Sequence, residues 1–216
     1  MRADAVLGGG PTAQPPLRAR WLGRVRYADG HALQRGLWAR GTDDWLLLQE
    51  HPHTYTMGVR ARAEHVLVDP ASVGAELVEA DRGGDVTYHG PGQLVGYPVR
   101  AVPGGKAASP RFVHGIEQLV IDAVADLGLP GASRLDGYPG VWVGVHEGRP
   151  RKLAAIGVRI SRGRSMHGFA LNVDPDMTFF DHIVPCGIAD KPVTSLAAEG
   201  LEVTMHQVVD AVISRA

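Results

Sequence analysis

A single cysteine, Cys186, is found among the 216 residues of the chain. One thiol cannot form a disulfide within the chain, and the cytoplasm is the compartment that keeps such a thiol reduced. Long apolar runs are missing too. None approaches the roughly 20 residues that cross a bilayer, and residues 1–16 lack the apolar stretch of a secretory signal. The sequence therefore predicts a cytoplasmic protein without a membrane segment.

A basic excess is also absent, because the formal net charge is −1. General nucleic-acid binding usually needs a strong positive charge, so none is expected. Lysine is scarce as well: only Lys106, Lys152 and Lys191 occur among 22 basic residues. Arginine stays protonated in proteins, so each lysine is a candidate for proton transfer. A surface lysine without a role is the alternative for each of them.

The composition is that of one globular domain, with 44% hydrophobic and 21% charged residues. No repeat or internal linker divides it. Residues 1–16 are rich in glycine and proline and are predicted to form a flexible tail. Residues 17–216 are predicted to form a single domain.

Two helices are predicted. Apolar residues recur at helical spacing over residues 109–127, with Ser109 as the expected cap and Pro110 at the first helical position. Residues 205–215 form the second, since Thr204 and Gln207 have the spacing of a capping box.

Short strands are predicted between these helices and before them. They cover residues 45–49, 54–57, 141–145, 152–160 and 169–173. The third and fourth of these strands form a hairpin around the turn at residues 147–150. Strands mixed with a few helices indicate an α+β protein, a mixed α/β arrangement in one domain with a mixed sheet.

Cys186 lies between Pro185 and Gly187. A proline and a glycine on either side produce a tight, rigid turn that can present a thiol close to backbone amides. The alternative is a small buried cysteine that only packs, and the residue alone does not decide between the two.

Lys152 begins a predicted strand. In a regular strand it would share the apolar face with Ala154, Ile156, Val158 and Ile160, where an amine is rare unless it has a task. A lysine near a cysteine favours the thiolate, which is the nucleophilic form. The alternative is a lysine at the strand end that bends out to water.

The most glycine-rich segment with polar side chains is residues 82–95, which carry four glycines around an arginine, a tyrosine and a histidine. Glycines let backbone amides approach a ligand closely. A phosphate loop is excluded because no Gly-x-x-x-x-Gly-Lys-Ser/Thr occurs. A turn-rich hairpin without a ligand is the alternative.

Histidines do not predict a metal site. His51 and His53 could face the same way, but one cysteine and no second pair of ligands argue against structural zinc. His167 is expected to cap or pack.

Four segments, in order along the chain, resemble the lipoyl(octanoyl) transferase family. They are residues 82–94, Lys152-Leu153-Ala154-Ala155-Ile156-Gly157, His167-Gly168-Phe169-Ala170-Leu171-Asn172-Val173, and Pro185-Cys186-Gly187 followed by Val193-Thr194-Ser195-Leu196. Residues 50–58 resemble a further upstream motif. The resemblance covers about residues 27–196.

This resemblance implies a domain with the fold of biotin and lipoate protein ligases and an acyltransferase activity. An octanoyl or lipoyl group would pass from acyl carrier protein to a lysine of a lipoyl domain, in protein lipoylation. Acceptors would be the apo lipoyl domains of 2-oxoacid dehydrogenase E2 subunits and the glycine cleavage H protein. No ATP, metal or other cofactor is implied, and a monomer is expected.

The resemblance also assigns roles to residues. Cys186 would be the thioester nucleophile and Lys152 its acid/base partner. The acyl substrate would be lined by Arg82, Gly83, Gly84, Asp85, Val86, Thr87, Tyr88, His89, Ala155, Ile156, Gly157, Gly168, Phe169 and Ala170.

Two other functions fit parts of the sequence. An ATP-dependent lipoate or biotin ligase of the same fold would need no cysteine nucleophile, and a non-catalytic acyl binder would show no turnover. Residues 148–173 also carry six basic residues and no acid. Those that face solvent are expected to steer an acidic carrier protein, and a solvated basic face without a role is the alternative.

Overall fold

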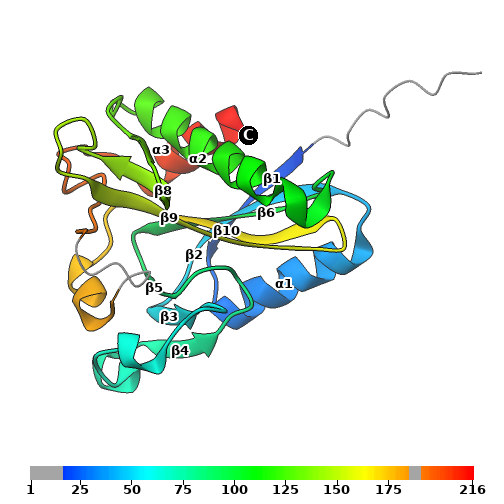
Figure 1. Ribbon diagram of the computed structural model, residues 1–216, viewed down its shortest axis with the longest axis horizontal. Helices are drawn as coiled ribbons and strands as arrows, with labels where there is room; N and C mark the ends of the chain where they lie inside the picture. The colour runs from blue at the N-terminus through cyan, green and yellow to red at the C-terminus, as the bar shows by residue number, and fades with distance from the viewer. Residues whose placement is uncertain (1–16, 185–190) are drawn as a thin grey trace, which may run out of the picture.

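The structure is a computed structural model that describes residues 17–184 and 191–216. Its main sheet has seven strands in the order β1-β2-β6-β10-β9-β8-β7 (Figure 1). The strands are β1 (Leu17–Arg24), β2 (Asp44–Glu50), β6 (Gln93–Val99), β10 (Arg164–Asn172), β9 (Arg151–Ser161), β8 (Tyr138–Val143) and β7 (Ser133–Leu135). Only β1 and β2 run parallel; the other neighbours are antiparallel. The predicted mixed sheet is therefore confirmed.

A second sheet has three strands in the order β4-β3-β5. They are β3 (Thr54–Met57), β4 (Glu76–Glu79) and β5 (Val86–His89). The β3–β4 pair is parallel and the β3–β5 pair antiparallel. This sheet brings the glycine-rich segment beside β9, because the Gly83 amide donates to the Val158 carbonyl at 3.0 Å.

Three α-helices cover the main sheet. They are α1 (Tyr27–Arg40), α2 (Ser109–Asp126) and α3 (Met205–Arg215). Helices α2 and α3 lie together on one face, whereas α1 and the small sheet lie on the other (Figure 1). Short 3-10 turns span Ala63–His65, Pro70–Val73, Gly105–Ala108 and Met177–His182. No helix in the described part of the chain has the length and hydropathy needed to cross a membrane.

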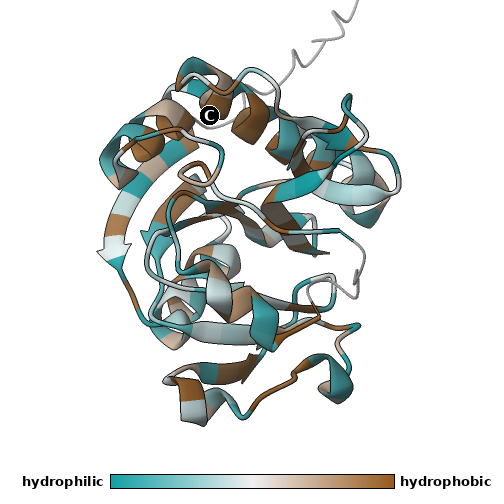
Figure 2. Ribbon diagram, turned by 90° about the vertical axis from the view of Figure 1, so that its left-hand side faces the viewer, coloured by the Kyte–Doolittle hydropathy of each residue, from teal (hydrophilic) through white to brown (hydrophobic). Residues whose placement is uncertain are grey.

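The largest hydrophobic core lies between the main sheet and helices α2 and α3. Val120 and Ala123 from α2 and Val208 and Val212 from α3 are fully buried there. A smaller cluster fills the other face, where Leu37 and Trp38 of α1 pack over the sheet. Hydrophilic and hydrophobic residues occur together on the helices and on the strands (Figure 2). The sheet is thus packed on both faces.

The two predicted helices are confirmed. Helix α3 begins after Thr204, whose side chain forms the predicted capping box with Gln207. The predicted cap of α2 was wrong: the N-cap is Ala108, and Ser109 is already helical. The Ser109 hydroxyl donates to the Lys106 carbonyl at 2.7 Å, because the preceding 3-10 turn brings that carbonyl within reach.

Helix α1 was not predicted from the sequence. Its buried positions are Tyr27, Gly30 and Gln34, so the face toward the sheet carries a glycine and an amide in place of a run of aliphatic residues. A Cβ at Gly30 would lie 2.5 Å from Gln49 Nε2, so a larger residue would displace the Gln49 side chain. Close approach of α1 to the sheet removes the apolar periodicity that identifies most helices.

Candidate active site

Cys186 lies outside the described residues, so the predicted nucleophile cannot be described. Lys152 is buried, with 7% of its surface exposed. Its Nζ lies 4.7 Å from the centre of the Trp142 ring, a contact that stabilises the ammonium. The Lys152 backbone bonds to the chain that follows the undescribed segment: its amide donates to Pro192 and its carbonyl accepts from Thr194, both at 2.9 Å.

The predicted face of Lys152 was wrong, because β9 is not regular at its start. Val141 of β8 faces Ala154, whereas the next residue, Trp142, faces Lys152. Leu153 is therefore an extra residue in a β-bulge. Leu153 and Ala154 both belong to the core under α2, while Lys152 and Ala155 both line a small cavity on the other face. The bulge turns the amine away from the core.

A cavity of about 40 Å³ lies on the α1 side of the sheet. Its walls come from α1, the glycine-rich segment, β6, β9 and β10. The lining residues are Tyr27, Arg82, Gly83, Gly84, Thr87, His89, Val95, Tyr97, Ala155, Ile156, Gly157, His167, Gly168, Phe169 and Ala170. Thr87, Ala155 and Ala170 also line the smaller cavity that contains Lys152. The two spaces are adjacent, so a ligand in the first can extend toward the amine.

Most residues assigned to the acyl substrate thus meet around one cavity, but three do not line it. Asp85 accepts from His65 Nδ1 at 2.7 Å, on the outer side of the glycine-rich segment. Val86 and Tyr88 point into the core of the small sheet, because alternate residues of β5 face opposite sides. Tyr88 hydrogen-bonds to His53 Nδ1 at 2.8 Å. These three residues contact other parts of the protein on the side of the wall that faces away from the cavity.

Sequence reasoning missed four lining residues, Tyr27, Val95, Tyr97 and His167. Tyr27 belongs to the helix without apolar periodicity. Tyr97 lies on a strand, β6, that was not predicted. His167 lies in one of the segments that resemble the family, whereas Tyr27 lies only at the start of the range that the resemblance covers.

A buried hydrogen-bond network joins the wall of the cavity to the strand of Lys152. Arg82 donates to Thr56 Oγ1 through Nε at 3.0 Å and Nη2 at 2.7 Å. His89 lies 3.4 Å from the same hydroxyl and 2.8 Å from Gln93 Oε1. Gln93 donates to Asn172 at 2.9 Å, and Asn172 donates to the Thr194 carbonyl at 2.9 Å. Thr194 in turn bonds to Lys152.

The surroundings of His89 determine its protonation and its tautomer. Burial, with smaller contributions from His51 and Arg82, holds the pKa of His89 well below its usual value, so the ring is neutral. Its Nδ1 faces a carbonyl oxygen of Gln93 and is assigned the proton. Nε2 then accepts from Thr56, whose hydroxyl oxygen is free to accept from Arg82. His89 therefore bridges Thr56 and Gln93 in the wall of the cavity.

Glycines allow three strands to approach one another at the cavity. A Cβ on Gly157 would lie 2.8 Å from the Gly83 carbonyl, and one on Gly168 would lie 2.2 Å from the Gly96 carbonyl. A Cβ on Gly96 would lie 2.2 Å from the Phe169 ring, which occupies that space across the β6–β10 pair. Glycine is needed at these positions because the neighbouring groups lie too close for a side chain, and not because the backbone turns there.

Replacing Thr56 by valine is expected to lower the free energy of unfolding by about 2 kcal/mol, because two hydrogen bonds from a buried guanidinium lose their acceptor. Thr56→Ser keeps the hydroxyl and is the matched control. Urea unfolding measures both variants. Equal stability of Thr56→Val and Thr56→Ser would show that the network contributes nothing.

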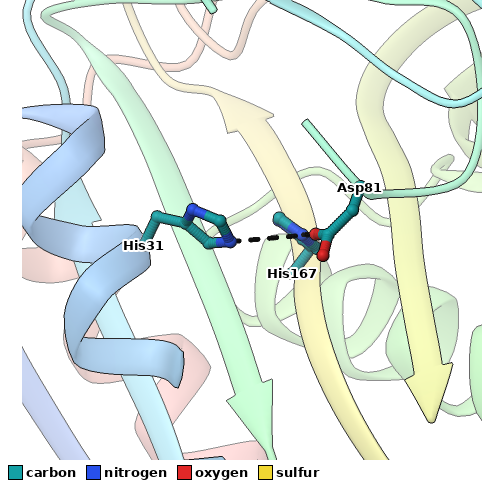
Figure 3. A group of neighbouring side chains, drawn as sticks. All are labelled: His31, Asp81 and His167. Atoms are coloured by element: carbon teal, nitrogen blue, oxygen red, sulfur yellow. Dashed lines mark hydrogen bonds and ion pairs between the residues drawn. The ribbon is translucent and has the colours of Figure 1, made fainter. Parts of the chain in front are cut away.

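A second polar cluster lies beside the cavity, where His31 from α1, Asp81 and His167 from β10 converge (Figure 3). His167 Nε2 is 2.6 Å from Asp81 Oδ1, and His31 Nε2 is 3.7 Å from the same oxygen. Burial lowers the pKa of His167 to about 4 despite the carboxylate, and it lowers the pKa of His31. His51 and His53, by contrast, bond to separate partners, Tyr97 and Tyr88.

The basic segment at residues 148–173 does not form one charged surface. Arg151 pairs with Glu199, Arg159 with Asp81 and Arg164 with Asp44, and Lys152 is buried. The exposed members are Arg149 and Arg162, in the turns at opposite ends of β9. The expectation that the solvent-facing members steer an acidic carrier protein stays a prediction.

A larger cavity, about 350 Å³, lies on the other face of the sheet, under α2. Its lining is mainly apolar and includes Arg100, Arg111 and Arg215. Lys152 does not line it, so size alone does not identify the functional cavity.

Comparison with known proteins agrees with the fold and the motifs. The family model for the lipoyl protein ligase A/B catalytic domain matches residues 26–216. An octanoyltransferase from Mycobacterium sp. (strain KMS) is 47% identical over 209 residues, covering 93% of this chain and 84% of the relative.

Solved structures confirm the predicted ligase-like fold. A bi-partite lipoate protein ligase from Thermoplasma acidophilum has a TM-score of 0.75 at 19% identity, covering 94% of this chain and 82% of that one. A biotin protein ligase from Aquifex aeolicus has a TM-score of 0.52 at 14% identity, covering 92% and 66%. The chain belongs to the lipoyl protein ligase A/B catalytic domain family, and within it to the octanoyltransferases.

Proposed function

We propose that this protein transfers an octanoyl group, or a lipoyl group, from acyl carrier protein to a lysine of a lipoyl domain, through a thioester on Cys186. One observation carries the proposal: the cavity walled by the glycine-rich segment, β9 and β10 adjoins the space around the buried amine of Lys152. An acyl chain in the cavity would bring its carbonyl toward that amine. The relatives named octanoyltransferase support the acyl group chosen.

The first half of the reaction forms the acyl-enzyme. The Cys186 thiolate attacks the carbonyl carbon of the carrier thioester, a new C–S bond forms and the bond to the carrier sulfur breaks. The Lys152 ammonium gives its proton to the departing sulfur and becomes neutral. The products are octanoyl-Cys186 and the free thiol of the carrier protein.

The second half forms the amide. The neutral amine of the acceptor lysine attacks the acyl carbon of octanoyl-Cys186, a C–N bond forms and the sulfur departs as thiolate. Lys152 takes up the proton that the nitrogen loses and is an ammonium again. No ATP is needed because the thioester already carries the activation. The residues that line the cavity bind the chain and are not consumed.

The acyl chain gains its affinity from burial. Each buried methylene contributes about 0.8 kcal/mol, so eight carbons are distinguished from six, and neighbouring lengths only weakly. A cavity of about 40 Å³ exceeds the roughly 10–15 Å³ that one water requires, but eight carbons need more. The walls must therefore separate on binding, and the glycine contacts at Gly83 and Gly157 are where they meet.

The partners follow from the same reaction. Octanoyl-acyl carrier protein is the donor, and the apo lipoyl domains of 2-oxoacid dehydrogenase E2 subunits and the glycine cleavage H protein are the acceptors. The protein acts as a monomeric single catalytic domain in the cytoplasm, where its one thiol stays reduced. It requires neither ATP nor a metal.

The experiment is intact mass analysis after brief incubation with octanoyl-carrier protein and a lipoyl domain, without ATP. We expect an octanoyl adduct on the enzyme that hydroxylamine removes, and an octanoylated lipoyl domain. Cys186→Ser should give neither product. A parallel reaction supplies ATP and free octanoate, as a ligase of this fold would need. Transfer in that reaction alone would overturn the proposal.

A further inference from the structure

We propose that His31, Asp81 and His167 form a binding site for a divalent transition-metal ion of the zinc type, separate from the acyl-transfer chemistry. Figure 3 shows the three side chains pointing toward one another from α1, the segment before Arg82 and β10. One ligand atom from each lies within 4.8 Å of the others. Two imidazoles and one carboxylate are ligands that zinc accepts, with water in the open position.

The carboxylate of Asp81 is arranged for one-oxygen ligation. Oδ1 faces both imidazoles, at 2.6 Å from His167 Nε2 and 3.7 Å from His31 Nε2. Oδ2 pairs with Arg159 Nη1 on the other side. Zinc ligands at about 2.0–2.1 Å in a tetrahedron lie roughly 3.4 Å apart. The ion therefore needs His167 and Asp81 to separate by about 0.8 Å, while Arg159 holds the carboxylate as an outer partner.

His31 is the residue that the rest of the structure leaves unexplained. Its Nε2 is buried yet makes no hydrogen bond within residues 17–184 and 191–216, and the ring stacks against His167 with centres 5.4 Å apart. Buried polar atoms are normally hydrogen-bonded. A metal at this point would use the lone pair of the neutral ring. Asp81 is 39% exposed at its side chain, so the site is open to solvent.

The position gives the ion a structural effect. Asp81 precedes Arg82, and His167 precedes Gly168, both of which line the acyl cavity. His167 also has a positive φ of 57°, a conformation that non-glycine residues rarely adopt and that the surroundings must hold. A bound ion would connect α1 to two walls of the cavity. The ion is not a reactant in acyl transfer.

The test is titration of the full chain with ZnCl₂ alone, followed by calorimetry. All proteins carry Cys186→Ser, so that the thiol cannot bind the metal. We expect one ion per chain, with an affinity that falls at least about 100-fold in His31→Ala, because even residues outside the ligand shell contribute 10- to 100-fold. His114→Ala, which removes an exposed histidine on α2, is the matched control and should bind as the parent does.

Two measurements keep the result unambiguous. Far-UV circular dichroism checks that each variant is folded, and His31→Gln replaces His31→Ala if that variant is not. X-ray absorption of the zinc-loaded parent should show two imidazole ligands and oxygen. Equal affinity in the parent and the His31 variants, an equal loss in His114→Ala, or fewer than two imidazoles on the metal would each overturn the proposal.

Discussion

Replacing Lys152 by methionine is expected to lower kcat/KM for octanoyl transfer about 10³-fold, within the 10²- to 10⁴-fold range of general acid–base catalysis. Methionine matches the length of the side chain and suits its buried surroundings. The loss would therefore come from the missing proton and charge and not from a change in fold. Acyl-enzyme formation and its transfer to the lipoyl domain, measured separately by rapid quench, should both slow.

The controls separate chemistry from packing. Lys152→Arg keeps the charge but cannot release a proton at neutral pH, so it should remain inactive in the amide-forming step. Lys191→Met is the matched variant, because Lys191 Nζ also lies over an aromatic ring, 4.6 Å from the centre of Tyr138. It should retain the wild-type rate within a few-fold. A Lys152→Met enzyme within about tenfold of wild type, or an equal loss in Lys191→Met, would exclude the proposed role.

Replacing Glu117 by alanine is expected to lower the free energy of unfolding by about 3 kcal/mol. Glu117 lies on α2 with 3% exposure, and both of its oxygens are used. Oε1 accepts from the Gly140 amide and Oε2 from Arg134 Nε, each at 2.9 Å. The alanine variant leaves a buried amide without a partner, which costs about 1–3 kcal/mol, and it removes a charge-assisted bond of similar size.

Thermal unfolding followed by calorimetry measures this effect. A loss of that size corresponds to a decrease in Tm of about 6–12 °C for a domain of this length. Gln118→Ala, at the exposed neighbouring position of the same helix, should shift Tm far less. If both variants unfold at the same temperature, the carboxylate does not stabilise the start of β8. Gly140 packs against Lys152, since a Cβ there would be 3.5 Å from Lys152 Cε, so activity of Glu117→Ala should fall as well.

The sequence predicted those parts of the fold that follow a simple period. Helices α2 and α3 have aliphatic residues at helical spacing, and β3 and β9 have short runs between turn residues. Helix α1 escaped prediction because Gly30 and Gln34 occupy its buried face. The reason for each of these two residues is a contact with a distant segment: Gln34 accepts from the His167 amide at 2.8 Å. Such contacts are not visible in a local pattern.

The candidate site, too, was predicted from the sequence only in part. Most residues that line one cavity belong to motifs that resemble a known family. The sequence could predict them because these motifs occur in the family's order along the chain. The side to which Lys152 points was wrong, since alternation assumes a regular strand and β9 has an extra residue at Leu153. His31 and Asp81 carried no signal at all. They lie 50 residues apart in sequence and meet only through the packing of α1 on the sheet.

The bulge in β9 makes the chemistry depend on the length of a strand as much as on its composition. Lys152 and Ala155 line the same cavity although they are three positions apart, because the bulge takes up one residue. A regular strand with the same number of residues would turn the amine toward the core beneath α2. Removing one residue between Lys152 and Ala155 would remove the bulge and leave the amine at the cavity. The side on which the reaction takes place therefore depends on residue count and bulge together, and engineering of this strand must change both or neither.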